Sequence, residues 1–306
     1  MSNKIAMRDA FFNQVYELAK KDREVVIVDA DMGAPSLDKY RRDFPERFVR
    51  VGIAEHNMIA VASGLAKEGK KVFTFAIAPF TTSRCHEFIK LNAGLMKIPI
   101  NIVGCGTGFS YDDSGPTHHT TEDISIMRPI PHLEILSPSD SKMAEKFANI
   151  SYNSPNPTYI RLDRKVFPDI FEKYYKNDNL RKGFKELEQG DSVAIVSTGN
   201  MVHRALEVRE HYKNEKIGVI DLYRLKPLNS YFKDALSKYK KILSLEEHIL
   251  DGGLGSIISE TITDNHLPVR LKRIGLNDYY YLYGRENIHK KTGLNVSSII
   301  AEIKKL

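Results

Sequence analysis

The 306-residue chain has no tryptophan and only two cysteines, Cys85 and Cys105, which lie apart without CxxC or Cys/His metal-ligand spacing. Two isolated cysteines exclude a disulfide framework and a zinc site, and they indicate a reducing compartment. No apolar run approaches the roughly 18 residues that cross a bilayer, and residues 1–20 include Asp9 and Glu17, unlike a signal peptide. We therefore expect a cytoplasmic protein that does not act at a membrane.

Concentrated charge is also missing. The 45 Lys and Arg residues against 39 Asp and Glu residues give a net charge of +6, and this excess is spread along the whole chain. A nucleic-acid-binding protein usually gathers its basic residues in one patch or helix stripe, so we expect no nucleic-acid partner. The mild positive charge is equally typical of a solvated surface and of an enzyme with small anionic substrates.

The chain does contain a regular alternation of short apolar runs and segments with helical periodicity, in both halves. The predicted strands cover residues 25–30, 72–77, 98–103, 133–136, 158–162, 192–197, 217–222, 241–245 and 269–274. Continuous apolar strands separated by helices indicate parallel sheets covered on both faces. We therefore predict an α/β fold with two doubly wound domains, residues 1–170 and 189–306, joined by a charged and aromatic linker over residues 171–188.

The densest polar stretch after a predicted strand covers residues 104–123, GCGTGFSYDDSGPTHHTTED. Ligands of open α/β sheets bind beyond the carboxyl ends of the strands. The glycines let the backbone approach a ligand, and the adjacent His118 and His119 titrate near neutral pH and suit proton transfer. A solvated surface loop is the ordinary alternative. Metal binding is a weaker one, because the side chains of sequence neighbours usually diverge.

A second stretch, VGIAEHNMIAVASG, places Glu55 at the predicted start of a helix. A carboxylate there can simply cap the helix and interact with its dipole, which stabilises a helix by about 0.3–1 kcal/mol. The residues around Glu55 are mostly apolar, however. If the side chain points inward, its carboxyl group can share a proton with a heterocycle nitrogen.

Two motifs in the first half, read together, resemble the pyrimidine-binding domain of the thiamine-diphosphate transketolase family: GIAEHNMIAVASGLA and, further along, DSGPTHHTTED. Three motifs in the second half resemble the C-terminal domain of that family in order and spacing: SVAIVSTGNMVHRALE, EEHILDGGLGSIISE and KKTGLNVSSIIAEI. The resemblance covers nearly the whole chain. It implies a pyrimidine-binding domain followed by a transketolase C-terminal domain.

One family motif is missing. Full-length transketolases begin with a domain whose GDG motif and downstream Asn pair hold Mg²⁺ and the diphosphate of the cofactor, and no GDG tripeptide occurs in this sequence. The resemblance therefore implies the C-terminal subunit of a split transketolase with no metal ligand of its own. Thiamine diphosphate and Mg²⁺ would be shared with an N-terminal subunit that carries the GDG motif, in a heterotetramer of two chains of each kind.

The resemblance also implies roles for single residues toward the cofactor. Glu55 matches the catalytic glutamate that binds the aminopyrimidine N1′, and His118 matches the catalytic histidine of the DGPTH motif, near the substrate oxygens. Asp31 matches a loop that approaches the cofactor. The aromatic wall against the aminopyrimidine is Phe75 or Phe80, and either residue could instead be plain core.

The substrate-binding residues follow from the same comparison. Arg164 takes the place of the phosphate-binding arginine of the family and Arg161 is the close alternative, although Arg164 could also form a surface ion pair with Asp163 or Asp169. Ser36 matches a residue near the substrate.

The positions of the His and Asp that recognise sugar hydroxyls in the family fall on Gly106 and Ser114. Asp113 or His119 could replace them, and the departure puts the usual ketose and aldose substrates in doubt.

The resulting expectation is an enzyme subunit that transfers a two-carbon ketol unit between sugar phosphates or related sugars. Within the same chemistry, the alternative is an enzyme for an unusual sugar, or a condensation similar to that of deoxyxylulose-phosphate synthase. A subunit similar to the β subunit of 2-oxo acid dehydrogenases is less compatible with DSGPTHH. A non-catalytic α/β module is the alternative from another class.

Overall fold

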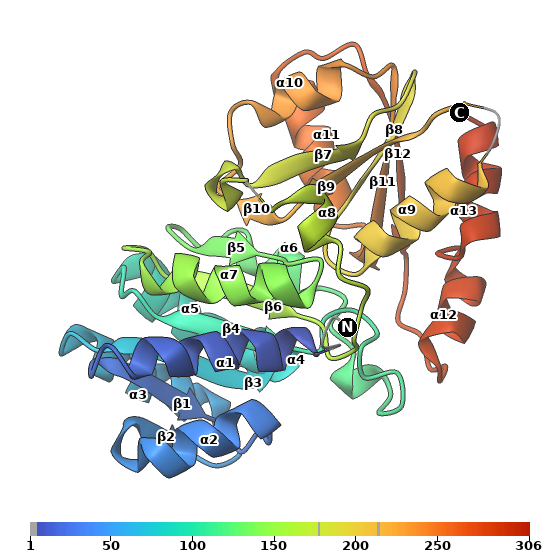
Figure 1. Cartoon of the computed structure of the whole chain (residues 1–306). Helices are drawn as coiled ribbons and strands as arrows, with labels where there is room; N and C mark the ends of the chain where they lie inside the picture. The colour runs from blue at the N-terminus through green and yellow to red at the C-terminus, as the bar shows by residue number, and fades with distance from the viewer. Residues whose placement is uncertain (1–4, 177, 213–214) are drawn as a thin grey trace.

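The computed structural model describes residues 5–176, 178–212 and 215–306, which form two α/β domains that lie one above the other in Figure 1. One sheet has seven strands and the other has five. Helices cover both faces of each sheet. The predicted fold class, two doubly wound α/β domains, is confirmed. Within the described residues, no helix is long and apolar enough to cross a membrane.

The first sheet has the strand order β10-β5-β6-β4-β3-β1-β2. Its strands are β1 (Val25–Asp29), β2 (Phe48–Arg50), β3 (Lys71–Ile77), β4 (Asn101–Cys105), β5 (Glu134–Leu136), β6 (Thr158–Leu162) and β10 (Arg224–Lys226). All neighbours are parallel except β10, which is antiparallel to β5. Because β1 has β2 on one side and β3 on the other, the strand order reverses at β1, where open α/β sheets bind ligands.

Two groups of helices cover this sheet. One face carries α1 (Met7–Ala19), α2 (Pro35–Asp43) and α7 (Ser141–Tyr152). The other face carries α3 (Glu55–Lys67), α5 (His86–Ile89), the π-helical turn η2 (Lys90–Leu95) and α6 (Asp123–Met127). Strands β1, β4 and β6 are buried at every residue, because helices lie on both sides of them. That burial explains why these strands show no polar–apolar alternation and why β1 is a nearly continuous apolar run.

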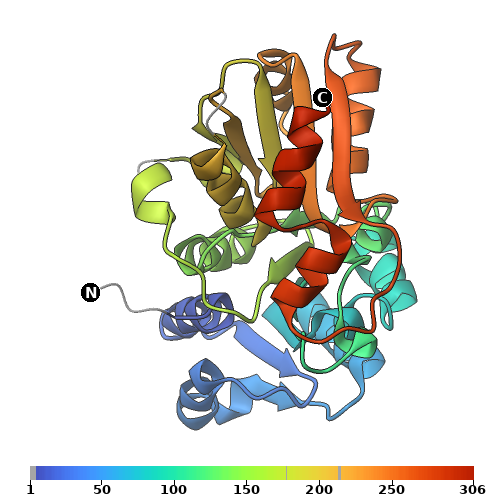
Figure 2. The same ribbon diagram turned by 90° about the vertical axis from the view of Figure 1, so that its right-hand side faces the viewer.

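The second sheet has the strand order β12-β11-β8-β9-β7. Its strands are β7 (Phe184–Glu188), β8 (Val193–Ser197), β9 (Gly218–Leu222), β11 (Lys241–Ile249) and β12 (Arg270–Leu276). The helices α9 (Met201–His211), α12 (Arg285–Thr292) and α13 (Val296–Lys304) pack on one face, and α10 (Phe232–Ser237) and α11 (Leu254–Asp264) on the other. Figure 2 shows α13 in front of this sheet and α12 below it, toward the first domain.

Three details go beyond the sequence prediction. The segment 171–188, expected to be a linker, contains α8 (Phe171–Tyr174) and β7, which is antiparallel to β9. Strand β10 comes from the second half of the chain but completes the first sheet. Strand β11 continues past its predicted end at residue 245, and the side chains that it adds, Glu246, Glu247 and His248, are buried. Consecutive ionisable residues lack the apolar pattern from which a buried strand is predicted.

Candidate functional site

The carboxyl ends of the parallel strands bring most of the predicted site residues to one edge of the first sheet. Asp31 follows β1, Glu55 follows β2, Phe80 follows β3, His118 follows β4 and Arg164 follows β6. Adjacent parallel strands end at the same edge, so residues far apart in sequence become neighbours there. This edge is the candidate site.

Glu55 is the first residue of α3 and is only 3% exposed. Gly52, with φ of 73°, turns the chain before the helix, and the Ala54 N–H donates a hydrogen bond of 2.8 Å to the Gly52 carbonyl. The Glu55 Oε2 accepts a hydrogen bond from Arg84 Nη1 at 2.7 Å, the one side-chain hydrogen bond of Glu55 within the described residues. Glu55 therefore points inward, and Arg84 balances its charge.

Phe80 and His118 lie next to this ion pair. The Arg84 guanidinium lies over the Phe80 ring, 4.4 Å from its centroid, and the His118 ring packs edge-on against Phe80 at 5.2 Å. Phe80 belongs to α4 (Ala78–Thr81), and His118 ends the 3-10 turn η3 (Pro116–His118). Both side chains are half-buried. Glu55, Arg84, Phe80 and His118 thus form a continuous cluster, which we call the glutamate cluster.

Sequence reasoning missed Arg84. It ends the segment VFTFAIAPFTTSR, and it reaches Glu55 because the chain after β3 turns back along the sheet edge toward α3. The available signal was a positively charged residue shortly after the predicted strand 72–77, which lies next to a carboxylate that the sequence suggested to be buried. A buried charge requires a partner.

Phe75 is not brought to the glutamate cluster. It is fully buried in β3 and packs edge-to-face against Phe12 of α1, with the ring centroids 4.7 Å apart. Phe75 therefore faces the helical layer opposite α3. Of the two aromatic candidates, the structure places Phe80 against His118 and against Arg84, which is hydrogen-bonded to Glu55.

The two predicted residues in the segment after β1 also lie outside this cluster. Asp31 has a left-handed backbone with φ of 59°, and its half-exposed carboxylate lies 3.7 Å from Arg50 Nη1. The Ser36 hydroxyl is buried and donates a hydrogen bond of 2.9 Å to Asp9 Oδ1 in α1. Within the described residues, neither side chain has a hydrogen bond to Glu55. This hydrogen bond of Ser36 connects α2 to α1.

The two arginine candidates have different environments. Arg161 is buried and directs its guanidinium to Asp123, with Nε 2.6 Å from Oδ2 and Nη2 3.0 Å from Oδ1. Arg164 has a side chain that is 40% exposed, lies over the Tyr111 ring at 4.7 Å and has Nη1 3.3 Å from Asp113 Oδ1. Of the two, Arg164 is the one that can reach an anion in solution. The ion pair of Arg161 with Asp123 connects β6 to α6.

Asp113 and His119 occupy different parts of the segment 104–123. Asp113 is exposed, and a hydrogen bond from the Ser114 hydroxyl lowers its pKa. His119 is 4% exposed, packs edge-on against Phe109 at 5.0 Å, and has an Nε2 without a hydrogen-bond partner within the described residues. Burial lowers the pKa of His119, which favours the neutral imidazole.

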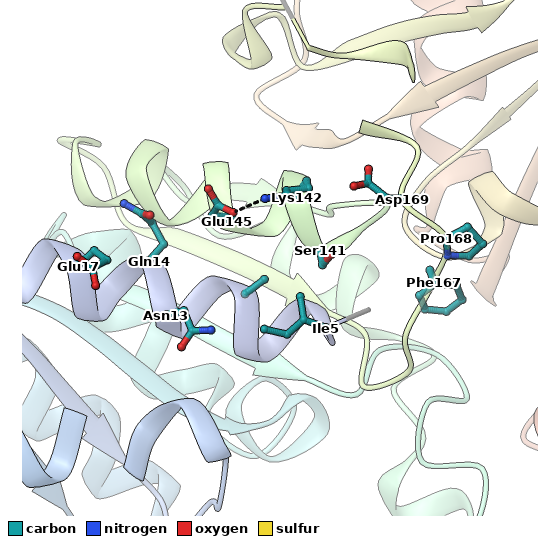
Figure 3. Close-up of a pocket in the computed structure, with 11 residues that line it drawn as sticks. Ile5, Asn13, Gln14, Glu17, Ser141, Lys142, Glu145, Phe167, Pro168 and Asp169 are labelled. Carbon is teal, nitrogen blue, oxygen red and sulfur yellow. Dashed lines mark hydrogen bonds and ion pairs between the residues drawn. The ribbon is translucent and has the colours of Figure 1, made fainter. Parts of the chain in front are cut away.

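A groove of about 630 Å³ lies elsewhere, between α1 and α7 (Figure 3). Asn13, Gln14 and Glu17 line it from α1, and the ion-paired Lys142 and Glu145 line it from α7. None of the predicted site residues is among the residues that line it. The groove lies on the helical face opposite α3, so it is separate from the glutamate cluster.

Together these observations define an α/β protein with a candidate ligand site at the carboxyl edge of its first sheet. Family models match residues 3–169 as the pyrimidine-binding domain of transketolase and residues 183–299 as the transketolase C-terminal domain. The chain belongs to the transketolase family and is a transketolase-like transferase, which confirms the resemblance found in the sequence. Membership of this family implies dependence on thiamine diphosphate.

Two similar transketolase subunits match this chain over nearly their full length. The B subunit of apulose-4-phosphate transketolase from Phocaeicola vulgatus is 32% identical over 292 residues, which are 94% of this chain and 92% of that protein. The 6-deoxy-6-sulfo-D-fructose transketolase subunit SqwH from a Clostridium species is 33% identical over 302 residues, with 96% and 92% coverage.

Solved structures agree with this assignment. A split-gene transketolase described as an inactive beta4 tetramer has a TM-score of 0.89 and 28% identity, with 98% of each chain covered. A transketolase from Pichia stipitis has a TM-score of 0.82 and 21% identity, and this chain spans 45% of it. The second likeness shows the fold alone.

Proposed function

We propose that this chain is the pyrimidine-binding subunit of a split, thiamine-diphosphate-dependent transketolase that transfers a two-carbon ketol unit between sugar phosphates or related sugars. The observation that carries the proposal is the buried Glu55 carboxylate, which Arg84 connects to Phe80 and thereby to His118. A helix-capping role alone would leave this carboxylate in solvent, where capping carboxylates ordinarily lie.

The side chains of the glutamate cluster fit the pyrimidine ring of thiamine diphosphate. Arg84 shows the fit, because its planar guanidinium donates a hydrogen bond to Glu55 and lies against the face of Phe80. Glu55 and Phe80 therefore already hold a flat N–H donor in the manner that an aminopyrimidine requires. When bound, thiamine diphosphate supplies the electron sink that cleavage of a carbon–carbon bond in a ketose needs.

The residues of this chain would then have separate roles. Glu55 holds a proton at the ring nitrogen, and the half-buried His118 imidazole gives or takes a proton at a substrate oxygen. General acid–base transfer of that kind contributes roughly 10²- to 10⁴-fold. Arg164 binds a substrate phosphate with two parallel hydrogen bonds, for which the guanidinium fork is suited, after it leaves Asp113.

We assign Mg²⁺ and the diphosphate to an N-terminal partner subunit with the GDG motif, in a heterotetramer with two copies of each chain. Exposed apolar side chains near Glu55 support a partner. Ile53 is 79% exposed and lies two residues before Glu55, and Leu95 is 74% exposed on η2, which contacts α3. Apolar surface of this kind marks protein interfaces. The names of the similar proteins, one a lettered transketolase subunit and one a split-gene transketolase, support the same arrangement.

The segment 104–123 favours an unusual sugar as the substrate, which is our second candidate within the same chemistry. A Cβ atom on Gly106 would lie 2.2 Å from the Tyr111 ring, so Tyr111 fills the space where a side chain at position 106 would begin. A histidine cannot occupy that position without displacing Tyr111. The two subunit relatives, named for apulose 4-phosphate and for a sulfofructose, support this direction.

The test is to purify the chain with and without the product of the neighbouring gene and to measure ketol transfer with thiamine diphosphate and Mg²⁺. The assembled enzyme should be active and the lone chain inactive. Glu55→Gln should lower turnover roughly 10²- to 10⁴-fold with unchanged folding, whereas Glu46→Gln, at a side chain that is 68% exposed, should keep it. Full activity of the lone chain would refute the split enzyme, and normal turnover of Glu55→Gln would refute the role of Glu55.

A further inference from the structure

The segment 104–123, which we call the histidine loop, is rich in glycine. Gly106, Gly108 and Gly115 have φ angles of 97°, 58° and 80°, in the left-handed region. A β-bridge between Gly108 and Thr120 joins the two arms of the loop, and the Thr120 hydroxyl donates a hydrogen bond of 2.9 Å to the Gly106 carbonyl. A catalytic side chain must be held within about 0.5 Å of its productive position, so a glycine-rich loop needs external support.

The second domain supplies that support at the base of the loop. Glu247 of β11 has a side chain that is 2% exposed, and its Oε2 accepts a hydrogen bond from the Phe109 N–H at 2.9 Å. A Cβ atom on Gly108 would lie 1.9 Å from the same oxygen. The loop backbone therefore lies directly on the Glu247 carboxylate, and only glycine fits at position 108.

Further contacts hold both arms of the loop. On the first arm, the Gly284 N–H donates to the Asp112 carbonyl at 3.1 Å and the Arg285 N–H donates to Asp112 Oδ2 at 2.8 Å. On the second arm, the Ile249 N–H donates to the Thr121 carbonyl at 2.7 Å. His118 lies between these two anchored points in the sequence.

The Glu247 carboxylate is itself fixed by charge. Arg285 Nε lies 2.8 Å from Glu247 Oε1, and Arg285 Nη2 also contacts Asp163 Oδ2 at 2.7 Å. His289 Nε2 contacts the same carboxylate. Burial alone would raise the pKa of Glu247, but the Arg285 guanidinium holds that pKa well below its usual range. Asp163 directly precedes Arg164, so the same network reaches the proposed phosphate-binding residue.

We propose that Glu247 is a positioning residue of the reaction: through the Phe109 N–H and through Arg285 it sets the placement of the histidine loop that carries His118. The second domain, which contributes no residue to the glutamate cluster, thereby acts on the proton transfer. This inference rests on the proposed role of His118. The placement of the loop by Glu247 can be measured without any catalytic activity.

Two variants separate the reach of the side chain from its charge. Glu247→Asp keeps the charge but is one methylene too short to reach both Phe109 and Arg285, whereas Glu247→Gln keeps the length but loses the charge. Asp221→Asn is the matched control. Asp221 is also a buried carboxyl group at the domain boundary, but it accepts hydrogen bonds from Ser139 and Tyr175 and not from the histidine loop.

Amide hydrogen exchange in the full chain gives the first readout, resolved on peptides that cover residues 104–123. Glu247→Asp should speed up exchange at Phe109 about tenfold, the effect expected for the loss of one hydrogen bond, whereas Glu247→Gln, whose amide oxygen can still accept, should speed it up less. In the assembled enzyme, kcat should fall roughly 10- to 100-fold. The affinity for thiamine diphosphate, measured by titration calorimetry, should change less than about threefold, because the side-chain partners of Glu55 and Phe80, Arg84 and His118, belong to the first domain.

The control separates positioning from general destabilisation. Asp221→Asn should keep both the exchange of the histidine loop and kcat within about twofold of the unmodified chain. Unchanged exchange in both Glu247 variants would overturn the inference, as would an equal loss of kcat in the control. If the unmodified assembly shows no ketol transfer, the proposed function fails, and the exchange measurement still decides whether Glu247 places the loop.

Discussion

Replacing Arg285 by methionine should destabilise the chain strongly, because one cation serves two buried carboxylates. The side chain of Arg285 is 10% exposed, and those of Glu247 and Asp163 are each 2% exposed. Methionine fills a similar volume but leaves both carboxylates without their guanidinium. The perturbation therefore removes charge compensation and retains most of the packing.

The expected loss follows from the burial of the pair. Removing one partner of a buried ion pair costs about 3–5 kcal/mol, since the remaining charge stays buried. His289 still contacts Glu247, so the loss should fall near the lower end, at about 3 kcal/mol. The exposed pair of Arg42 and Asp43 provides the comparison, and Arg42→Met should cost at most about 1 kcal/mol.

Urea denaturation followed by circular dichroism measures these differences. The pH dependence adds a second readout. The folded-state pKa of Glu247 is lowered, so the stability it contributes is present above its unfolded pKa and is lost as the pH falls through its folded pKa. Acid should therefore reduce the difference between the unmodified chain and Arg285→Met. Adding Glu247→Gln to Arg285→Met should restore part of the stability, because one uncompensated charge disappears.

A loss no larger than that of Arg42→Met would refute this reasoning. It would mean that water or neighbouring groups compensate Glu247 and Asp163 as well as Arg285 does. A double variant no more stable than Arg285→Met would refute the assignment of the loss to buried charge. In that case the loss would come from packing.

Three further outcomes are expected. Phe75→Ala should lower the free energy of unfolding by about 3–5 kcal/mol in a urea titration. Phe80→Ala should leave folding intact and weaken thiamine diphosphate binding by about 0.5–1.5 kcal/mol in calorimetry of the assembled enzyme. The reverse pattern would exchange the two roles. Arg164→Gln should raise KM roughly 10- to 100-fold for phosphorylated sugars but not for unphosphorylated ones, and equal effects on both would exclude phosphate binding. Burial raises the pKa of Asp221 to about 7, so the stability that Asp221 contributes should be lost as pH rises from about 4 to 7; an identical pH dependence of the unfolding free energy in the unmodified chain and in Asp221→Asn over this range would refute this.

The fold class was predictable because its signals are local. Buried strands such as β1 and β8 are apolar at almost every residue, and the helices between them have their own period. Strand β10 has three residues and one buried side chain, Leu225, so it carries no such pattern. Its place in the first sheet is decided by tertiary pairing with β5.

The candidate site was predictable in part for a related reason. The position of Glu55 at the start of a helix and of His118 in a glycine-rich loop could be read from neighbouring residues. The contact of Arg84 with Glu55 could not, because a loop decides which way the chain turns after β3. Spacing could not separate Phe75 from Phe80 either. Their difference depends on α1, which covers Phe75 and not Phe80.

Strand β10 also has a consequence for how this chain can be divided. A fragment that stops at residue 170 would keep β5 and its neighbour β6 but would lose β10 on the other side of β5. The backbone groups on that side of β5 would then be unpaired. Uncovered sheet edges recruit other chains and lead to aggregation. A truncated first domain would therefore need another strand in place of Arg224–Lys226, which lie in the second half of the chain. We therefore expect the two domains to be stable as one unit.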